Sequence, residues 1–152
     1  MFPKMRRYKK ELSKEETFKV LEKGIDGVLG TISHTGYPYT VPVNYAVLNG
    51  KIYFHSALTG HKIDNIKNNE LVSLAVITKN EIIEEEFTTD FQSVIVFGKA
   101  KLVEPSQEIL MALIKKYSSS FLKEGKEYVK KGYMSTQLVE ITIDHITGKE
   151  RK

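Results

Sequence analysis

The residues best suited to chemistry lie in one short stretch, 55–62, which reads His-Ser-Ala-Leu-Thr-Gly-His-Lys. This stretch joins a β-rich run to a short helix, which is indicated by an apolar pair three residues apart. Unpaired backbone N–H groups at a helix N-terminus carry a partial positive charge and attract anions. Gly60 lets the backbone approach a ligand closely. The side-chain donors around it are Ser56, Thr59, His61 and Lys62.

This pattern predicts a site for a phosphate monoester. The alternative is that Thr59 simply caps the helix and that His61 and Lys62 are solvated. Metal binding is not favoured, because His55 and His61 have no third ligand near them in the sequence and a metal needs three or four. His34 and His145 are expected to be solvated. The chain has no cysteine and no hydrolase motif of the Gly-x-Ser-x-Gly or His-Glu-x-x-His type.

A second candidate is the β-rich run 37–48, which contains Pro38 and Pro42. Proline cannot donate to a strand ladder, so this run is expected to have a free edge or a break. Unpaired backbone groups there could contact the polar edge of a flat heterocycle, or the run could be an ordinary edge strand protected against aggregation. Tyrosines 37, 39, 45 and 53 could line a pocket, or could pack as half-buried strand residues.

Length and composition favour one globular domain covering residues 1–152, of which 41% are hydrophobic and 28% charged. No apolar run approaches the roughly 20 residues of a membrane span, and no signal peptide follows the basic N-terminus. A cytoplasmic protein without membrane contact is therefore expected.

The net charge of +4 is concentrated at the two ends of the chain. Residues 1–10 form a basic arm with five Lys or Arg and no acid, and residues 149–152 carry three basic side chains and one acidic one, which leaves −3 on the body. Proteins that bind nucleic acids normally carry positive charge on the folded surface that meets the phosphates. Nucleic acid is therefore disfavoured as a partner, and solvated termini are expected.

The elements that would position the candidate residues are mostly strands. Ser13 and Glu16 have capping-box spacing at the start of a helix that should end at Gly24. Three β-rich runs follow, 27–33, 37–48 and 51–57. The turns between them, 34–36 and Asn49-Gly50, predict two short hairpins and hence a three-stranded antiparallel meander.

Further strands are expected at 71–77, 91–103 and 138–144. The nearly continuous apolar run 71–77 predicts burial on both faces, Gly98 predicts a bulge, and the acidic segment 78–90 is expected to be an exposed loop. A helix with an apolar face should begin at Pro105, and a second helical stretch, 121–129, should be interrupted near Gly125. Six short antiparallel strands with flanking helices predict a small β-barrel, mainly β, of the α+β class.

The segments 36–45 (GYPYTVPVNY), 51–57 (KIYFHSA) and 60–66 (GHKIDNI) resemble the FMN-binding split-barrel family. More narrowly, they resemble its pyridoxamine 5′-phosphate oxidase-related group, which includes Nim-type nitroimidazole-resistance proteins. Further matching segments, spread over nearly the whole chain, are 5–7, 87–89, 93–100 and 146–149. The resemblance implies a six-stranded antiparallel split β-barrel and a homodimer with two FMN molecules in clefts between the subunits.

The resemblance also implies roles for individual residues. His61 and Lys62 would bind the FMN phosphate, and His61 would also match a histidine implicated in Nim-type chemistry, which makes it the candidate catalytic residue. The other implied cofactor-binding residues are His55 and Ser56 beside the phosphate or ribityl chain, Pro42, Val43, Asn44 and Tyr45 along the isoalloxazine, and Gln92 and Ser93 on the long strand. Many Nim-like members have a cysteine where this chain has Glu86, so any role for that thiol is absent.

The activity implied by the resemblance is that of an FMN-dependent oxidoreductase reducing nitroaromatic compounds, with NADH or NADPH as reductant. No Gly-x-Gly-x-x-Gly motif for a nicotinamide is present. One alternative is flavin storage or sensing without turnover. Pyridoxamine phosphate oxidation is disfavoured, because no extra basic cluster that would grip a phosphorylated substrate is found near the C-terminus. Arg151 and Lys152 lie in the end tail. A nucleic-acid-binding barrel that uses residues 1–10 is the alternative from another class.

Overall fold

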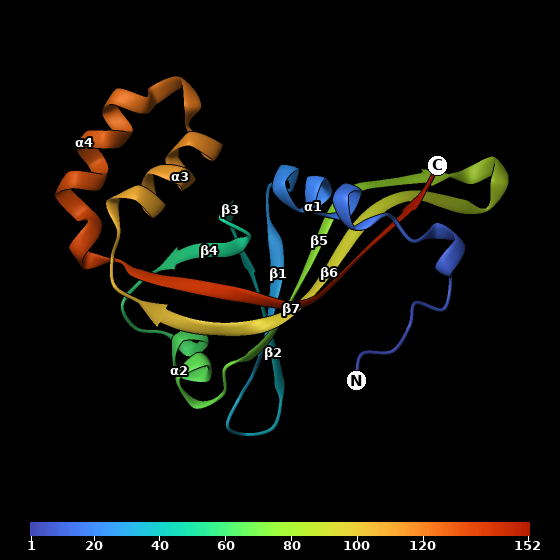
Figure 1. Ribbon diagram of the computed structural model, residues 1–152, viewed down its shortest axis with the longest axis horizontal. Helices are drawn as coiled ribbons and strands as arrows, with labels where there is room; N and C mark the ends of the chain where they lie inside the picture. Colours follow the sequence, from blue (N-terminus) through green and yellow to red (C-terminus); the bar gives the residue numbers. More distant parts are fainter.

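The computed structural model describes residues 1–152 (Figure 1). The strands are β1 (Gly27–Ile32), β2 (Pro38–Val43), β3 (Ala46–Leu48), β4 (Lys51–Ser56), β5 (Leu71–Ile83), β6 (Thr88–Val103) and β7 (Gln137–Arg151). The α-helices are α1 (Lys14–Lys23), α2 (His61–Asn68), α3 (Gln107–Tyr117) and α4 (Leu122–Gly132). Short 3-10 turns occur at η1 (Tyr8–Lys10), η2 (Glu84–Glu86), η3 (Ser119–Phe121) and η4 (Tyr133–Ser135).

All seven strands form one antiparallel sheet in the order β2-β1-β5-β6-β7-β4-β3. The two edge strands, β2 and β3, are joined directly through Asn44 and Tyr45. The chain can span at most about 11 Å between Val43 and Ala46, so the sheet must curl until its edges meet. The α+β, mainly β fold is confirmed, with seven strands instead of six.

The expected three-stranded meander is wrong, because the run 37–48 breaks after Val43. β2 pairs only with β1, and β3 pairs only with β4. At the break the side chain of Tyr45 is fully buried, and its hydroxyl donates to the Leu21 carbonyl at 2.5 Å. The hairpin at Asn49-Gly50 is confirmed, with both residues at positive φ (52° and 76°) as primed turns require.

Two helices complete the core enclosed by the sheet. α1 is capped as predicted, since the Ser13 hydroxyl accepts from the Glu16 N–H at 3.2 Å and Gly24 forms the C-cap. α1 and α2 contribute the buried side chains Val20, Leu21, Ile63 and Ile66. The strand residues at the centre of the same core include Leu29, Ile52, Phe54, Leu74, Val96 and Ile141. Burial of each such side chain stabilises the fold by about 1.5–3 kcal/mol.

β5 is buried on one face, not on both. Val72, Leu74 and Val76 point into the core, whereas Leu71 and Ile77 are 50% and 64% exposed. The run 71–77 reads as nearly continuously apolar because outward-facing side chains, such as Leu71 and Ile77, are apolar too. No element of this chain covers that outer face of β5. The bulge predicted at Gly98 is confirmed by a register shift between Phe97 and Gly98 in the pairing of β6 with β7.

The acidic segment 78–90 is a hairpin arm and not a loop. β5 continues to Ile83, η2 turns the chain, and β6 begins at Thr88. Arg151 forms ion pairs with Asp90 and, at 3.7 Å, with Glu86, which offsets the acidic charge. The expectation of a solvated C-terminal tail is accordingly wrong, because 149–151 lie in β7 and pair with β6 along this arm (Figure 1).

α3 and α4 form a helical hairpin at one end of the sheet (Figure 1). It packs on a second, smaller cluster that includes Ala46 and Leu138. The predicted interruption near Gly125 is wrong, since α4 is continuous there. Gly125 is instead a contact point, because a Cβ at this position would overlap the Ile114 side chain on α3.

The N-terminal arm is anchored to the folded body through Phe2 and, just beyond its end, through Leu12, while most of its side chains are exposed as expected. The Leu12 N–H donates to the Gly148 carbonyl at 2.9 Å, and the Phe2 ring lies 4.6 Å from the His145 ring and 5.2 Å from the Phe97 ring. His145, expected to be solvated, is therefore half-buried in this stack. No helix combines the length and the apolar character needed to cross a bilayer.

Candidate functional site

The N-terminus of α2 is free of side-chain caps. Its N-cap residue is Gly60, with φ of 151°, and no side chain accepts from the first backbone N–H groups. Thr59 therefore does not cap the helix, and the alternative that explained this turn by a Thr59 cap is wrong. A Cβ at Gly60 would meet no atom within 4 Å, so the space in front of the helix is open. These N–H groups remain available to an anion.

His61 and Lys62 are the first two residues of α2. The His61 ring lies 4.0 Å from the ring of Tyr39 on β2, which orients the imidazole at the helix start. Lys62 is half-buried and forms no ion pair. The helix itself is held in place by Asn65, whose side chain donates to the Thr31 hydroxyl at 3.0 Å inside the core.

His55 and Ser56 diverge, although they are neighbours on β4. Successive strand residues point to opposite faces, and His55 faces the α3–α4 hairpin. Burial there lowers the pKa of His55. Ser56 is half-buried and its hydroxyl donates to the Ala57 carbonyl at 3.0 Å. The structure thus directs His55 away from the face that Ser56 occupies.

The segment 42–45 lies where the two sheet edges meet. Pro42 is exposed on the outer face of β2, while the Val43 side chain packs against the core. The Asn44 side chain donates to the Ile25 carbonyl at 3.1 Å. Pro38 and Pro42 both lie on β2, which is an edge strand and ends at Val43. The prolines predicted a free edge or a break in the run 37–48, and the structure has both.

α3 takes up the backbone polar groups of Tyr45. The Tyr45 N–H donates to the Tyr117 hydroxyl at 3.0 Å, and the Tyr45 carbonyl accepts from the Lys116 ammonium at 2.8 Å. That ammonium lies 3.9 Å from the Tyr45 ring centre, and burial lowers the pKa of Lys116 to about 8. Sequence reasoning missed both α3 residues, because nothing in a helical pattern identifies a partner 71 or 72 residues away.

Gln92 and Ser93 also lie on opposite faces of their strand. The Gln92 amide accepts from the Thr78 hydroxyl and donates to Glu150, both at 2.7 Å, so its polar atoms already have partners. Ser93 faces outward opposite Ile77. Gln92 is therefore committed to the hairpin arm, and Ser93 is the one of the pair with a free side chain.

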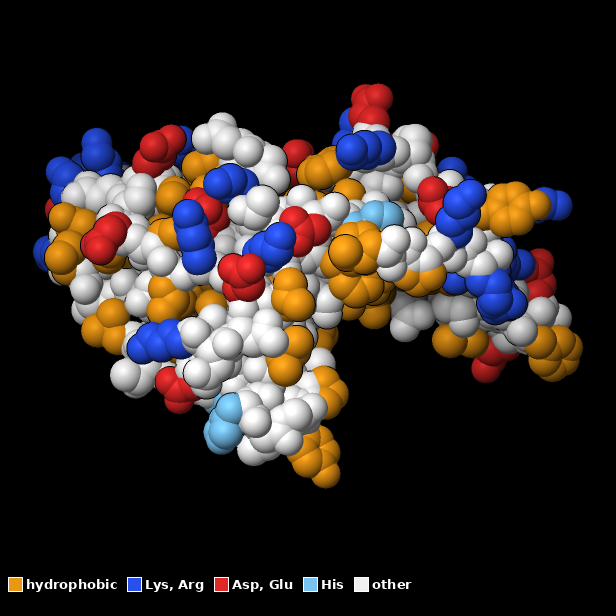
Figure 2. Space-filling model, turned by 60° about the horizontal axis from the view of Figure 1, so that its bottom comes forward, with side chains coloured by type: hydrophobic (Ala, Val, Ile, Leu, Met, Phe, Trp, Pro, Cys, Tyr) orange, Lys and Arg blue, Asp and Glu red, His pale blue; other side chains and the backbone are white.

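The outer face of the sheet carries a continuous apolar patch. Strand pairing aligns Val28 with Ala75 and Ile95, and Gly30 with Ser73 and Phe97. We call this patch the outer apolar face and define it by its exposed side chains: Val28, Ile32, Ile77, Ile95 and Phe97. Figure 2 shows hydrophobic side chains along the concave boundary between the β1–β2 hairpin, which projects downward, and the β5–β6 arm at the right.

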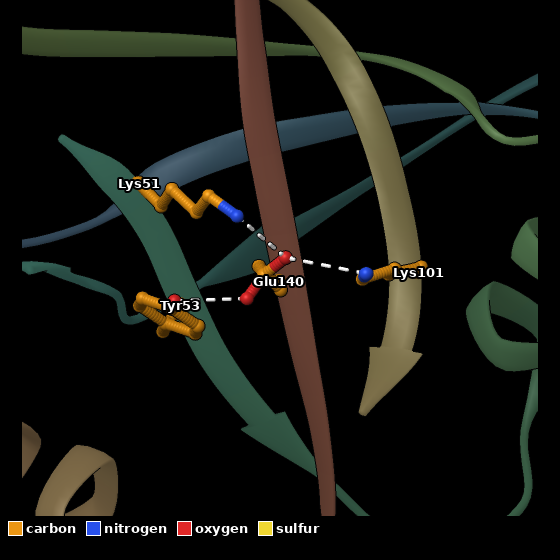
Figure 3. A network of polar contacts seen from close by, with 4 residues as sticks. All are labelled: Lys51, Tyr53, Lys101 and Glu140. Carbon is orange, nitrogen blue, oxygen red and sulfur yellow. Dashed lines mark hydrogen bonds and ion pairs between the residues drawn. The ribbon is translucent and has the colours of Figure 1, made fainter. Parts of the chain in front are cut away.

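A second polar cluster lies on β4, β6 and β7 (Figure 3). Glu140 accepts from the Tyr53 hydroxyl at 2.9 Å and from the Lys51 ammonium at 3.1 Å, and Lys101 lies 3.8 Å away. Burial raises the pKa of Glu140, but these hydrogen bonds and cations outweigh it and lower the pKa overall. A carboxylate with three partners stabilises the sheet and is poorly suited to accept a proton from a substrate.

The sequence matches a known family over most of its length. A model described as pyridoxamine 5′-phosphate oxidase matches residues 13–150, and the chain belongs to that family. This confirms the resemblance read from the sequence. No curated protein sequence matches the chain.

Solved structures share the fold. A proposed 5-nitroimidazole antibiotic resistance protein from Bacteroides thetaiotaomicron superposes with a TM-score of 0.71 at 19% identity, over 91% of this chain and 85% of that one. A conserved hypothetical protein from Mycobacterium tuberculosis gives 0.83 at 19% identity, over 97% and 90%. An FAD-binding protein from Mesorhizobium loti gives 0.64 at 24% identity, over 93% and 97%.

Proposed function

We propose that the protein is an FMN-binding oxidoreductase and that the N-terminus of α2 holds the FMN phosphate. The observation that carries this proposal is the uncapped helix start at Gly60, followed by His61 and Lys62, in a chain of the pyridoxamine 5′-phosphate oxidase family. The residues present fit a phosphate, because free N–H groups, a helix dipole and a cation without a partner converge there. The relative described as FAD-binding supports a flavin in this fold.

When bound, FMN would supply the hydride or electron transfer, and the residues of this chain would bind and orient it. His61 and Lys62 would contact the phosphate, with Ser56 beside it. Pro42, Val43 and Asn44 would follow the isoalloxazine. Tyr45 has a supporting role in this proposal, since its backbone groups already bond to Lys116 and Tyr117.

A homodimer belongs to the same proposal, with FMN in clefts between the subunits. The outer apolar face supports it, because large contiguous apolar patches on soluble proteins mark interaction surfaces. Ser93 lies on this face and would contact the flavin from there. The whole chain, 1–152, would act as one flavin-binding domain, completed by its partner.

The electron acceptor we propose is a nitroaromatic compound of the nitroimidazole type, with NADH or NADPH as the electron donor. The similar structure described as a proposed 5-nitroimidazole antibiotic resistance protein supports this choice. Flavin storage or sensing without turnover is the second candidate function, favoured by the uncapped N–H groups, His61 and Lys62 of the α2 N-terminus, which suit anion binding and require no proton transfer.

The test is titration of flavin-free protein with FMN, followed by absorbance at the flavin bands. His61→Ala and Lys62→Ala should each weaken FMN binding by roughly 10- to 100-fold. Lys67→Ala, in the last turn of the same helix, is the matched control and should bind as the wild type does. A wild-type protein that remains colourless with added FMN refutes the proposal. Bleaching of bound flavin by NADH or NADPH, and reoxidation by a nitroimidazole, separates an oxidoreductase from a storage protein.

A further inference from the structure

A cleft of about 390 Å³ lies between the α3–α4 hairpin and the end of β4. Its walls are apolar and come from both helices: Leu110, Leu113, Ile114 and Val129. Its volume falls within the roughly 300–1,000 Å³ typical of small-molecule sites. The cleft is separate from the α2 N-terminus, because His55, which lines it, and Ser56 point to opposite faces of β4.

The polar rim of this cleft is cationic and carries no acid. Its polar side chains are His55, Tyr128, Lys131, Tyr133, Ser135 and Thr136. Lys131 forms no ion pair, although Glu127, one turn earlier on α4, lines an adjoining pocket with it. Burial lowers the pKa of His55, which favours the neutral imidazole, a hydrogen-bonding group. A ligand that places a flat apolar body between the helices and an anionic group at Lys131 would match both the apolar walls and the polar rim of the cleft.

We propose that this cleft is a second ligand site, for a small aromatic anion such as an aromatic carboxylate or sulfonate. The aromatic body packs on Leu113 and Val129, and the anionic group contacts Lys131 with the Ser135 and Thr136 hydroxyls nearby. A cation is disfavoured, since no carboxylate lines the cleft to receive it. The site does not depend on flavin binding.

The probe for the test is 8-anilinonaphthalene-1-sulfonate, whose fluorescence rises in apolar sites and which carries one anionic group. Full-length protein is titrated with and without FMN. Lys131→Glu should weaken probe binding about tenfold, since it replaces attraction by repulsion. Lys130→Glu is the matched control, because Lys130 is exposed on the same helix but does not line the cleft, and it should change affinity less than about twofold.

A filling variant gives an independent readout. Gly132 lines the cleft, has φ of −119°, and a Cβ there would meet no atom within 4 Å. Gly132→Leu should therefore be accommodated without a clash, and the bulk that it adds at a residue lining the cleft should weaken probe binding about tenfold. Circular dichroism melting checks the fold of each variant.

Displacement of the probe tests the charge preference. Benzoate should displace it, whereas benzylamine, of similar size and opposite charge, should not. The proposal is overturned if Lys131→Glu and Gly132→Leu bind the probe as the wild type does, which would place the probe elsewhere, for example on the outer apolar face. Equal displacement by benzylamine would overturn the assignment to an anion.

Discussion

The Tyr117 hydroxyl lies next to both backbone groups of Tyr45: it accepts from the Tyr45 N–H at 3.0 Å and lies 2.8 Å from the Tyr45 carbonyl. It also donates to the Ile25 carbonyl at 2.5 Å. One side chain from α3 thus ties together the link between the two sheet edges and the segment that precedes β1. The two edge strands, β2 and β3, do not pair with each other. The Tyr117 contact therefore helps to fix the link between them.

Tyr117→Phe should lower the free energy of unfolding by about 1–3 kcal/mol, because it leaves the Tyr45 N–H without its partner. Urea denaturation followed by circular dichroism measures the loss. Tyr128→Phe is the control, since Tyr128 is 76% exposed and its hydroxyl forms no hydrogen bond within the protein, so its effect should stay within about 0.5 kcal/mol. Equal losses in the two variants would contradict a structural role for Tyr117.

Glu140→Gln should lower stability at neutral pH by about 1–2 kcal/mol, since it removes the charge that Lys51 and Lys101 contact. The folded pKa of Glu140 is lowered, so its contribution is present above the unfolded pKa and is lost as pH falls through the folded value. The difference between wild type and variant should therefore shrink toward acid, when the wild-type side chain is protonated. Exposed Glu127→Gln should show no such trend.

Tyr53 makes the same network sensitive to alkali. Burial, followed by the hydrogen bond to Glu140, raises the pKa of Tyr53 to about 12. Because the folded pKa is raised, the contribution of Tyr53 is full below the unfolded value of about 10 and is lost as pH rises through about 12. Tyr53→Phe should abolish this alkaline dependence, which thermal melts between pH 9 and 12 would record. An unchanged alkaline slope would count against the network.

Gly125→Ala and Gly132→Ala should have opposite effects, although both lie in α4. A Cβ at Gly125 overlaps Ile114, so the helices must separate, at a cost of about 1–3 kcal/mol. At Gly132 the space is open, and alanine should be neutral or stabilise by up to about 1 kcal/mol. Melting temperatures of the two variants provide the comparison, and destabilisation by both would refute the packing argument.

Phe97→Glu should convert the proposed dimer to monomers, because it places a charge within the outer apolar face. Light scattering coupled to size exclusion gives the mass. Phe121→Glu is the control, because Phe121 is 63% exposed but lies in η3, between the two helices of the α3–α4 hairpin. A wild-type monomer, or a Phe97→Glu dimer, would contradict the proposed role of this face.

Local signals in the sequence predicted the elements well. The Ser13 cap, the Asn49-Gly50 hairpin and the Gly98 bulge are interactions between residues close in sequence or properties of one residue. The prediction of a meander was wrong because the pairing of β2 and β3 depends on the burial of Tyr45, which no local pattern predicts. The acidic segment failed for the same reason, since its counter-charge, Arg151, lies 61 residues beyond Asp90.

The candidate site was predictable where its residues are contiguous. Gly60, His61 and Lys62 are consecutive, so their placement at a helix start follows from the sequence. Whether His55 joins them depends on which face of β4 the α3–α4 hairpin covers, and this is a tertiary fact. The contribution of Lys116 to the Tyr45 carbonyl is equally tertiary.

The place of β7 in the sheet governs when the sheet can close. β7 follows the other six strands in the sequence, yet it lies between β6 and β4. Until its fifteen residues leave the ribosome, β3 and β4 are an isolated two-stranded ribbon, which is marginally stable at best. Closure of the sheet is therefore a late step of folding, which waits for β7. Until then the edges of β4 and β6 that face β7 are unpaired and prone to aggregation.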